Sequence, residues 1–162
     1  MPTLQRTGKE IVRIYDRHVD SVYRLCFSFM KNPADAEDMV QETFLRLMSS
    51  GKQFESEEHE KAWLIVTASN LCKDALKKWW RKNENIDDYA ATLQSDDIPD
   101  NSVVQAILDL PTKYKTVVYL YYYEGYATAE IARYLRCREA TVRSRLSRAR
   151  KQLHSMLGGD LQ

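Results

Sequence analysis

Turn-forming residues are scarce in this sequence, and their scarcity restricts the fold more than any other feature. The 162 residues include 5 glycines and 4 prolines, about half of the roughly 12% that globular proteins usually carry. A β-sandwich or small barrel needs a turn residue every ~8–12 positions. Because 44% of the residues are hydrophobic, the chain also carries more apolar side chain than a disordered protein does. The sequence therefore predicts an all-α fold.

Several classes of protein are disfavoured by the distribution of apolar and metal-binding residues. The longest apolar run covers residues 117–123, far short of the ~18 residues that cross a bilayer. Residues 1–10 are polar and lack a signal-peptide pattern. The three cysteines and three histidines are scattered, without the spacing of zinc ligands or of a disulfide framework. We therefore expect a cytoplasmic protein with no membrane insertion, no bound metal and no cofactor.

Charge divides the chain into three parts, although the formal net charge is only +1. Residues 1–82 carry 14 basic and 12 acidic side chains, residues 83–102 carry none and 6, and the rest carry 10 and 5. The acidic middle segment has few large apolar residues, as a flexible linker would. We expect two small helical domains, at 8–82 and 103–158, joined by this linker at 83–102. One domain with a long surface loop is the alternative, although loops of ~20 residues are uncommon inside compact domains.

Apolar residues at three- and four-residue spacing predict three helices in the first domain. The first helix covers residues 11–29. Asn32 and Pro33, an N-cap residue followed by a proline at the first helical position, begin a second helix. A third helix follows the polar stretch at 49–60 and ends in a basic run at 77–82.

The C-terminal part contains a helix-turn-helix signature. A short amphipathic helix and a longer one closed by Gly125 precede two helices placed almost back to back, at 128–135 and about 139–156. The small side chain of Ala132 suits the point where one helix crosses the other. The turn falls at Arg136, where glycine would be usual because a left-handed backbone costs another residue roughly 1 kcal/mol.

The last predicted helix is strongly basic. Between Val142 and Leu153 it has five basic residues and no acidic one. Surface helices usually mix their charges, so this bias favours contact with the major groove of DNA over a solvated basic face. The candidate contacts on this helix and the turn before it are Arg138, Thr141, Arg143, Ser144, Ser147 and Arg148.

Tryptophans and cations are interleaved along the third predicted helix. Aromatic rings beside cations stack on unpaired bases, whereas tryptophan in a small helical domain is more often core, and for Trp63 alone the core is favoured. Trp79 and Trp80 differ by about 100° around the helix, so they cannot both point inward. The candidate contacts to single-stranded DNA are Phe54, Trp63, Asn70, Lys73, Lys77, Trp80 and Arg81.

The second predicted helix carries an acidic patch. This patch either complements the positive end of the helix dipole or forms a protein-binding face, and the residues alone leave both readings open. Its members are Asp35, Glu37, Asp38, Gln41 and Glu42.

Three motifs in order resemble the extracytoplasmic-function (ECF) sigma factors, the small two-domain initiation subunits of bacterial RNA polymerase. Residues 35–47, DAEDMVQETFLRL, resemble the AEDLVQETF motif of region two, and residues 62–70, AWLIVTASN, resemble its WLxxIAxN pattern. Residues 110–150, with LP, EGY, EIA and the run TVRSRLSRAR, resemble region four. The resemblance covers about residues 10–157 and implies a region-two bundle and a region-four helix-turn-helix.

The resemblance also implies partners. In the family, the acidic helix docks on the clamp helices of the largest subunit of core RNA polymerase, which here points to Asp38, Gln41, Glu42 and Phe44. The flap tip of the second-largest subunit is expected near Tyr122. Residues 54–61 and the third helix are expected to open the minus-ten promoter element and hold a flipped base, with Asn70 as a base contact. The last helix is expected to read the minus-thirty-five element.

Function follows from the resemblance as an expectation. It implies a bacterial sigma factor that binds core RNA polymerase, directs it to promoter DNA and assists melting, is a monomer when free, and answers to an anti-sigma factor. A stand-alone helix-turn-helix repressor is the other class; such proteins usually dimerise and need no melting module. An enzyme has little support, since the histidines lie in separate elements and no glycine-rich phosphate loop is present.

Overall fold

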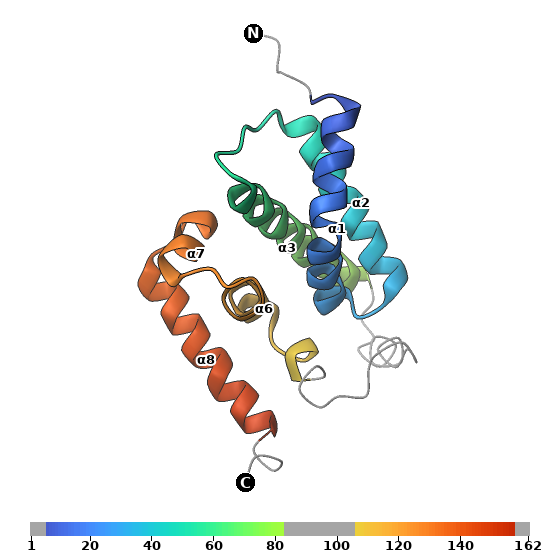
Figure 1. Cartoon of the computed structure of the whole chain (residues 1–162). Coiled ribbons are helices and arrows are strands. Elements are labelled where there is room, and N and C mark those ends of the chain that lie inside the picture. Colours follow the sequence, from blue (N-terminus) through green and yellow to red (C-terminus); the bar gives the residue numbers. More distant parts are fainter. Residues whose placement is uncertain (1–5, 83–105, 158–162) are drawn as a thin grey trace. The chain divides into compact units, whose positions relative to one another are not determined.

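The computed structural model describes residues 6–82 and 106–157, and every regular element in these two ranges is helical. The chain forms two compact units, Met1–Glu84 and Asn85–Gln162, which are coloured along the sequence in Figure 1. The predicted all-α fold with two helical domains is confirmed. The predicted linker at 83–102 lies outside the described residues.

The first unit is a bundle of three helices, α1 (Gly8–Met30), α2 (Pro33–Ser50) and α3 (Glu57–Lys82). Each helix packs on the other two. The predicted start of α2 is confirmed, because the Asn32 side chain accepts the Asp35 N–H at 2.9 Å and Pro33 occupies the first turn. The largest fully buried apolar side chains of this bundle are Val22, Leu25, Phe29, Leu47, Leu64 and Ile65.

The third helix begins earlier than its apolar pattern predicts. Ser56 caps it, since the Ser56 hydroxyl accepts the His59 N–H at 3.1 Å and the Ser56 carbonyl accepts the Glu60 N–H at 3.0 Å. Acidic residues, including Glu57 and Glu58, fill the first turn, where the helix dipole favours negative charge. A polar first turn carries no hydrophobic periodicity. The start of α3 could therefore have been recognised only from its N-cap residue, Ser56.

The second unit contains α6 (Thr112–Val118), η1 (Tyr119–Tyr123), α7 (Thr128–Leu135) and α8 (Glu139–Leu157). Of the short helix expected before α6, residues 106–108 are helical, and its earlier part lies outside the described residues. The sequence predicts one regular helix up to Gly125, but η1 is a π-helical turn, in which the Glu124 N–H reaches the Tyr119 carbonyl at 3.0 Å. Gly125 ends it with φ +77°, as expected of a C-terminal cap.

The turn between α7 and α8 has the backbone that the sequence predicts. Arg136 adopts φ 56° and ψ 48°, in the left-handed region. The Cys137 N–H donates to the Ala132 carbonyl at 3.0 Å, which closes the end of α7. Ala132 is buried, and so are Val142, Leu146 and Ala149 on the inner face of α8.

A buried polar cluster joins α1 to the first turn of α3. His18 is buried, and its Nε2 lies 2.8 Å from the Glu60 carboxylate, which also accepts the Arg17 guanidinium at 2.9 Å. Burial lowers the pKa of His18 below its ordinary value of 6.5, against the opposing effect of Glu60. His18 is therefore held neutral in the folded unit.

His18 makes the stability of the first unit depend on pH. Because the folded-state pKa lies below the unfolded value of 6.5, the unfolded chain binds the proton more readily. The contribution of His18 to the free energy of unfolding is therefore fully present above about pH 6.5 and is lost as the pH drops toward the folded pKa. Denaturant unfolding followed by tryptophan fluorescence reports this unit alone, since Trp63, Trp79 and Trp80 all lie in α3.

The matched variants for this test are His18→Gln and His154→Gln. His18→Gln should flatten the dependence between pH 8 and 5.5, because glutamine can donate to Glu60 but does not titrate. His154, exposed in α8, serves as the control, and its substitution should leave the dependence as it is in the wild type. An undiminished slope in His18→Gln would contradict the assignment.

A second stability prediction concerns the left-handed residue between α7 and α8. Arg136→Gly should stabilise the second unit by up to about 1 kcal/mol, because glycine adopts φ 56° without steric cost. Arg133→Gly, within α7, should instead destabilise it by about 1 kcal/mol. Thermal unfolding by far-ultraviolet circular dichroism measures both, while the tryptophan signal of the first unit should not move. Loss of stability in Arg136→Gly would refute the strain argument.

Candidate nucleic-acid interface

In the loop between α2 and α3, the side chain of Phe54 is held in place by several neighbouring side chains. Its ring lies edge-on to Trp63, with 5.7 Å between centroids, and to His59 at 5.4 Å. The guanidinium of Arg6 lies over the ring at 5.1 Å. Aromatic and cation–π contacts of this kind restrain a loop side chain. The loop therefore presents a half-buried aromatic ring beside the first turns of α3.

The outer side of α3 offers an amide and a line of cations. Asn70 is exposed and lies two turns beyond the half-buried Trp63, so the two share one side of the helix. Lys73 is half-buried, and exposed side chains continue to the end of the helix at Lys77, Trp80 and Arg81. This side has the aromatic and cationic character that suits unpaired bases and phosphates.

The tryptophans of α3 differ in exposure. Trp80 is 51% exposed whereas Trp79 is half-buried, which confirms that the adjacent pair cannot both point inward. Trp63 is half-buried against Phe54 instead of being enclosed in the bundle. The core position favoured for Trp63 alone is therefore only partly realised.

The outer face of α8, with the turn before it, displays the basic and hydroxyl residues that the sequence predicts. Arg138, Arg143, Ser147 and Arg148 are exposed, and Thr141 and Ser144 are half-buried. The inward side chains of Val142, Leu146 and Ala149 fix this orientation. An α-helix with such a face fits the major groove, where arginine can contact guanine or phosphate.

One arginine of this face is already engaged. Arg143 contacts the Glu139 carboxylate at 3.0 Å, one turn earlier in α8. The same Glu139 carboxylate accepts the Thr128 hydroxyl at 2.8 Å, which links the starts of α7 and α8. An exposed ion pair of this spacing contributes only about 0.3–0.5 kcal/mol, so a phosphate can replace it at little cost.

Arg150 is directed toward the tyrosines of η1, a contact that the sequence analysis did not predict. Its Nε donates to the Tyr122 hydroxyl, and its guanidinium lies 5.9 Å from the Tyr121 ring centroid. Tyr119 stacks on Tyr123 with 5.1 Å between centroids. Tyr122 is 52% exposed. The tyrosine-rich sequence of η1 was the available signal.

The acidic helix α2 has an exposed polar face over a buried aromatic residue. Asp38, Gln41 and Glu42 are exposed. Phe44 is only 5% exposed and lies 4.9 Å from the Tyr15 ring of α1, centroid to centroid. Phe44 therefore supports this surface from below.

Exposed apolar side chains on α1 and α2 extend this face, and the sequence analysis missed them. Tyr15, which the periodicity assigns to the buried side of α1, is 43% exposed. A pocket of about 390 Å³ opens between α1 and α2, with Tyr15, Tyr23 and Gln41 in its lining. Leu45 and Met48 are also exposed. Both are apolar residues out of phase with the buried side of α2, which is the pattern that could have revealed them.

Within residues 6–82 and 106–157, no group of histidine, cysteine, aspartate or glutamate has a metal-binding arrangement. None of the helices described there combines the length and apolarity needed to cross a membrane.

Family models match both units. Sigma-70 region 2 matches residues 14–82, and Sigma-70 region 4 matches residues 100–153. The first match contains the Phe54 loop and α3, and the second contains α7 and α8 as far as residue 153.

Whole-chain relatives agree with these matches. The ECF RNA polymerase sigma factor SigW of Bacillus subtilis is 30% identical over 89% of this chain and 87% of its own length. The RNA polymerase sigma factor SigV of the same organism is 31% identical, over 97% and 96%. In fold, the sigma factor RpoE of Bartonella quintana, solved with the anti-sigma factor NepR, has a TM-score of 0.71 at 21% identity, over 93% of this chain and 98% of that one. The chain belongs to the ECF RNA polymerase sigma factors of the sigma-70 family.

Proposed function

We propose that the chain is the promoter-recognition subunit of a bacterial RNA polymerase, binding the core enzyme, directing it to particular promoters and helping to melt them. The observation that carries the proposal is the pairing of two different nucleic-acid surfaces in one chain. The first unit offers an aromatic and amide surface on α3, and the second offers a basic helix, α8, of major-groove character. The chain's role is to bind and position, so no covalent chemistry is assigned to it.

The first unit is proposed to recognise and open the minus-ten element. Moving a base out of the duplex stack costs a few kcal/mol of free energy. A protein pocket can offset part of this cost by stacking on the base and hydrogen-bonding to it. Phe54 and Trp63 supply aromatic surface, and the exposed amide of Asn70 can hydrogen-bond a base edge. Lys73, Lys77, Trp80 and Arg81 would then follow the strand along α3.

The second unit is proposed to read the minus-thirty-five element. α8 would enter the major groove, with Arg148 and Ser147 toward base edges and with Arg138 and Thr141 near its start toward phosphates. Ser144 lies on the same face. Arg143 would exchange Glu139 for a phosphate on binding.

Core polymerase is proposed to hold both units. The acidic face of α2, with Asp38, Gln41 and Glu42, would supply charge complementarity to the clamp helices, while exposed Leu45 and Tyr15 would supply apolar contact area. Phe44 would act from beneath by supporting Tyr15. Tyr122 would contribute to the flap-tip contact of the second unit.

Regulation and organisation complete the proposal. The chain would consist of two domains, at 8–82 and 103–158, with a linker at 83–102. The polymerase would hold these two weakly DNA-binding domains at a fixed separation, which raises the effective concentration of the second DNA contact once the first has formed. The free chain would be a monomer in the cytoplasm. An anti-sigma factor, of the kind bound to RpoE in its solved complex, would silence it by covering the polymerase-binding face.

Reconstitution with core polymerase tests the function. Core enzyme with this chain should select particular sequences from a random duplex pool and start RNA chains at a fixed distance downstream of them. Core enzyme alone should do neither. Tight, sequence-specific binding of duplex DNA by the free chain, without any effect on where polymerase starts, would instead make it a stand-alone repressor or activator.

Two exposed side chains separate the proposed roles of the two units. Asn70→Ala should lower open-complex formation while leaving polymerase binding intact, because only a base contact is removed. Arg148→Ala should weaken recognition of the upstream element by ~1–3 kcal/mol if it reads a base. Permanganate footprinting measures the first effect, and competition between upstream-element sequences measures the second. Equal loss of polymerase binding and melting in Asn70→Ala would indicate a folding defect.

A further inference from the structure

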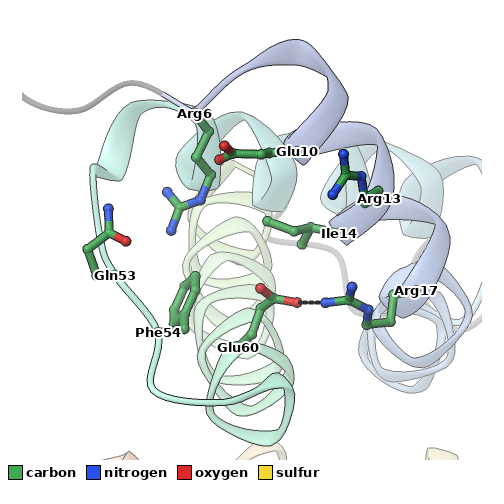
Figure 2. A pocket seen from close by; sticks show the side chains of 8 residues that line it. All are labelled: Arg6, Glu10, Arg13, Ile14, Arg17, Gln53, Phe54 and Glu60. Carbon is green, nitrogen blue, oxygen red and sulfur yellow. Dashed lines mark hydrogen bonds and ion pairs between the residues drawn. The ribbon is translucent and has the colours of Figure 1, made fainter.

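A second pocket in the first unit has no role in the proposed function. It has a volume of about 230 Å³ and lies between the N-terminal half of α1 and the loop that carries Phe54. Figure 2 shows three arginines, Arg6, Arg13 and Arg17, arranged around it, with Phe54 and Glu60 on the other side. Trp63 and Asn70 are not part of its lining. The pocket is therefore distinct from the proposed base contacts, although it shares the Phe54 wall with them.

The carboxylate at the base of the pocket is already committed to protein partners. Glu60 is 8% exposed and accepts both the Arg17 guanidinium at 2.9 Å and His18 at 2.8 Å. Glu57 lies 3.7 Å from Arg17. These contacts compensate Arg17, so Glu60 does not compensate the other two arginines.

Arg6 brings positive charge to the pocket while it fixes the loop. Its guanidinium donates to the carbonyls of Leu47 and Lys52 and lies over the Phe54 ring at 5.1 Å. Carbonyl oxygens carry no net charge, so the positive charge of Arg6 remains uncompensated by these contacts. Arg6 thus joins the start of α1 to the loop wall.

Arg13 is the cation of the pocket that a ligand can reach most freely. It is exposed and makes no hydrogen bond or ion pair with any residue in the described ranges. On the same side of the pocket, between Arg6 and Arg13 in Figure 2, Glu10 is the remaining acidic side chain of the lining, exposed in the first turn of α1. After Arg17 and Glu60 are counted as a pair, two arginines face one carboxylate, which favours an anion over a cation.

We propose that this pocket binds a phosphodiester group of the melted non-template strand, next to the bases held on the far side of Phe54. Guanidinium groups suit phosphate because their planar fork can donate two hydrogen bonds at once. The shared Phe54 wall places the phosphate site beside the proposed base contacts, so the strand that reaches one reaches the other. The inference rests on the proposed function and adds α1 to the surface that follows the strand.

The test uses reconstituted holoenzyme and a fluorescent single-stranded oligonucleotide that carries the selected minus-ten sequence. Binding is followed by anisotropy over a series of salt concentrations. Arg13→Gln should weaken binding roughly threefold to tenfold and reduce the slope of log K against log salt by about 0.7, the value for one phosphate contact on a single strand. Glu10→Gln should tighten binding, because it removes the opposing charge. Arg24→Gln, exposed on α1 outside the pocket lining, should bind as the wild type does.

Neutral methylphosphonate linkages, introduced one at a time, then locate the phosphate. At one position the replacement should weaken binding of the wild type and have no further effect on Arg13→Gln. Wild-type binding by both Arg13→Gln and Glu10→Gln would overturn the inference, as would the absence of any coupled position. Both side chains are exposed, and unchanged tryptophan-detected unfolding would exclude a folding defect.

Two further outcomes remain distinct from these. If inorganic phosphate at constant ionic strength stabilises the free chain through Arg13, and no strand position is coupled, the site belongs to a free phosphate ester and the strand assignment is wrong. If wild-type holoenzyme binds the oligonucleotide no better than core polymerase does, the proposed function itself fails.

Discussion

The contacts that the buried Glu60 carboxylate makes with α1 position the proposed base-binding surface of the first unit. The carboxylate holds Arg17 and His18 of α1 to the first turn of α3, and that turn carries His59 and precedes Trp63. Since Phe54 packs on both of those rings, the position of the loop follows from the position of the turn. A buried carboxylate that lost its partners would cost several kcal/mol, so the three elements are ordered together.

Much of the fold is predictable because its local signals are strong. Asn32 followed by Pro33 fixes the start of α2, and the arginine in the turn after α7 adopts the left-handed backbone expected of it. The misses share a cause. The first turn of α3 is polar, and η1 departs from the α-helical hydrogen-bond pattern, so neither follows the 3.6-residue period on which the prediction relied.

The candidate site is predictable in its outline but not in its side-chain partners. Helical periodicity correctly predicts that Arg143 and Arg150 are exposed, but it does not predict which side chains lie beside them. Arg143 meets Glu139 of its own helix, and Arg150 meets Tyr122, 28 positions earlier in the sequence. Tyr15 is the converse case, because it falls in the buried stripe of α1 but is large enough to reach solvent past Phe44.

These intramolecular contacts are relevant to how strongly a two-unit sigma factor binds DNA in the absence of core polymerase. In the proposed DNA complex, Arg143 must leave Glu139, and each long side chain that is ordered loses rotamer entropy of up to about 2 kcal/mol. Such costs subtract from the affinity of each unit for DNA, whereas the polymerase, by holding both units, removes most of the translational cost of the second contact. In the proposed mechanism, the same weak exposed contacts would lower the affinity of the free chain for DNA and so leave promoter binding under the control of the core enzyme.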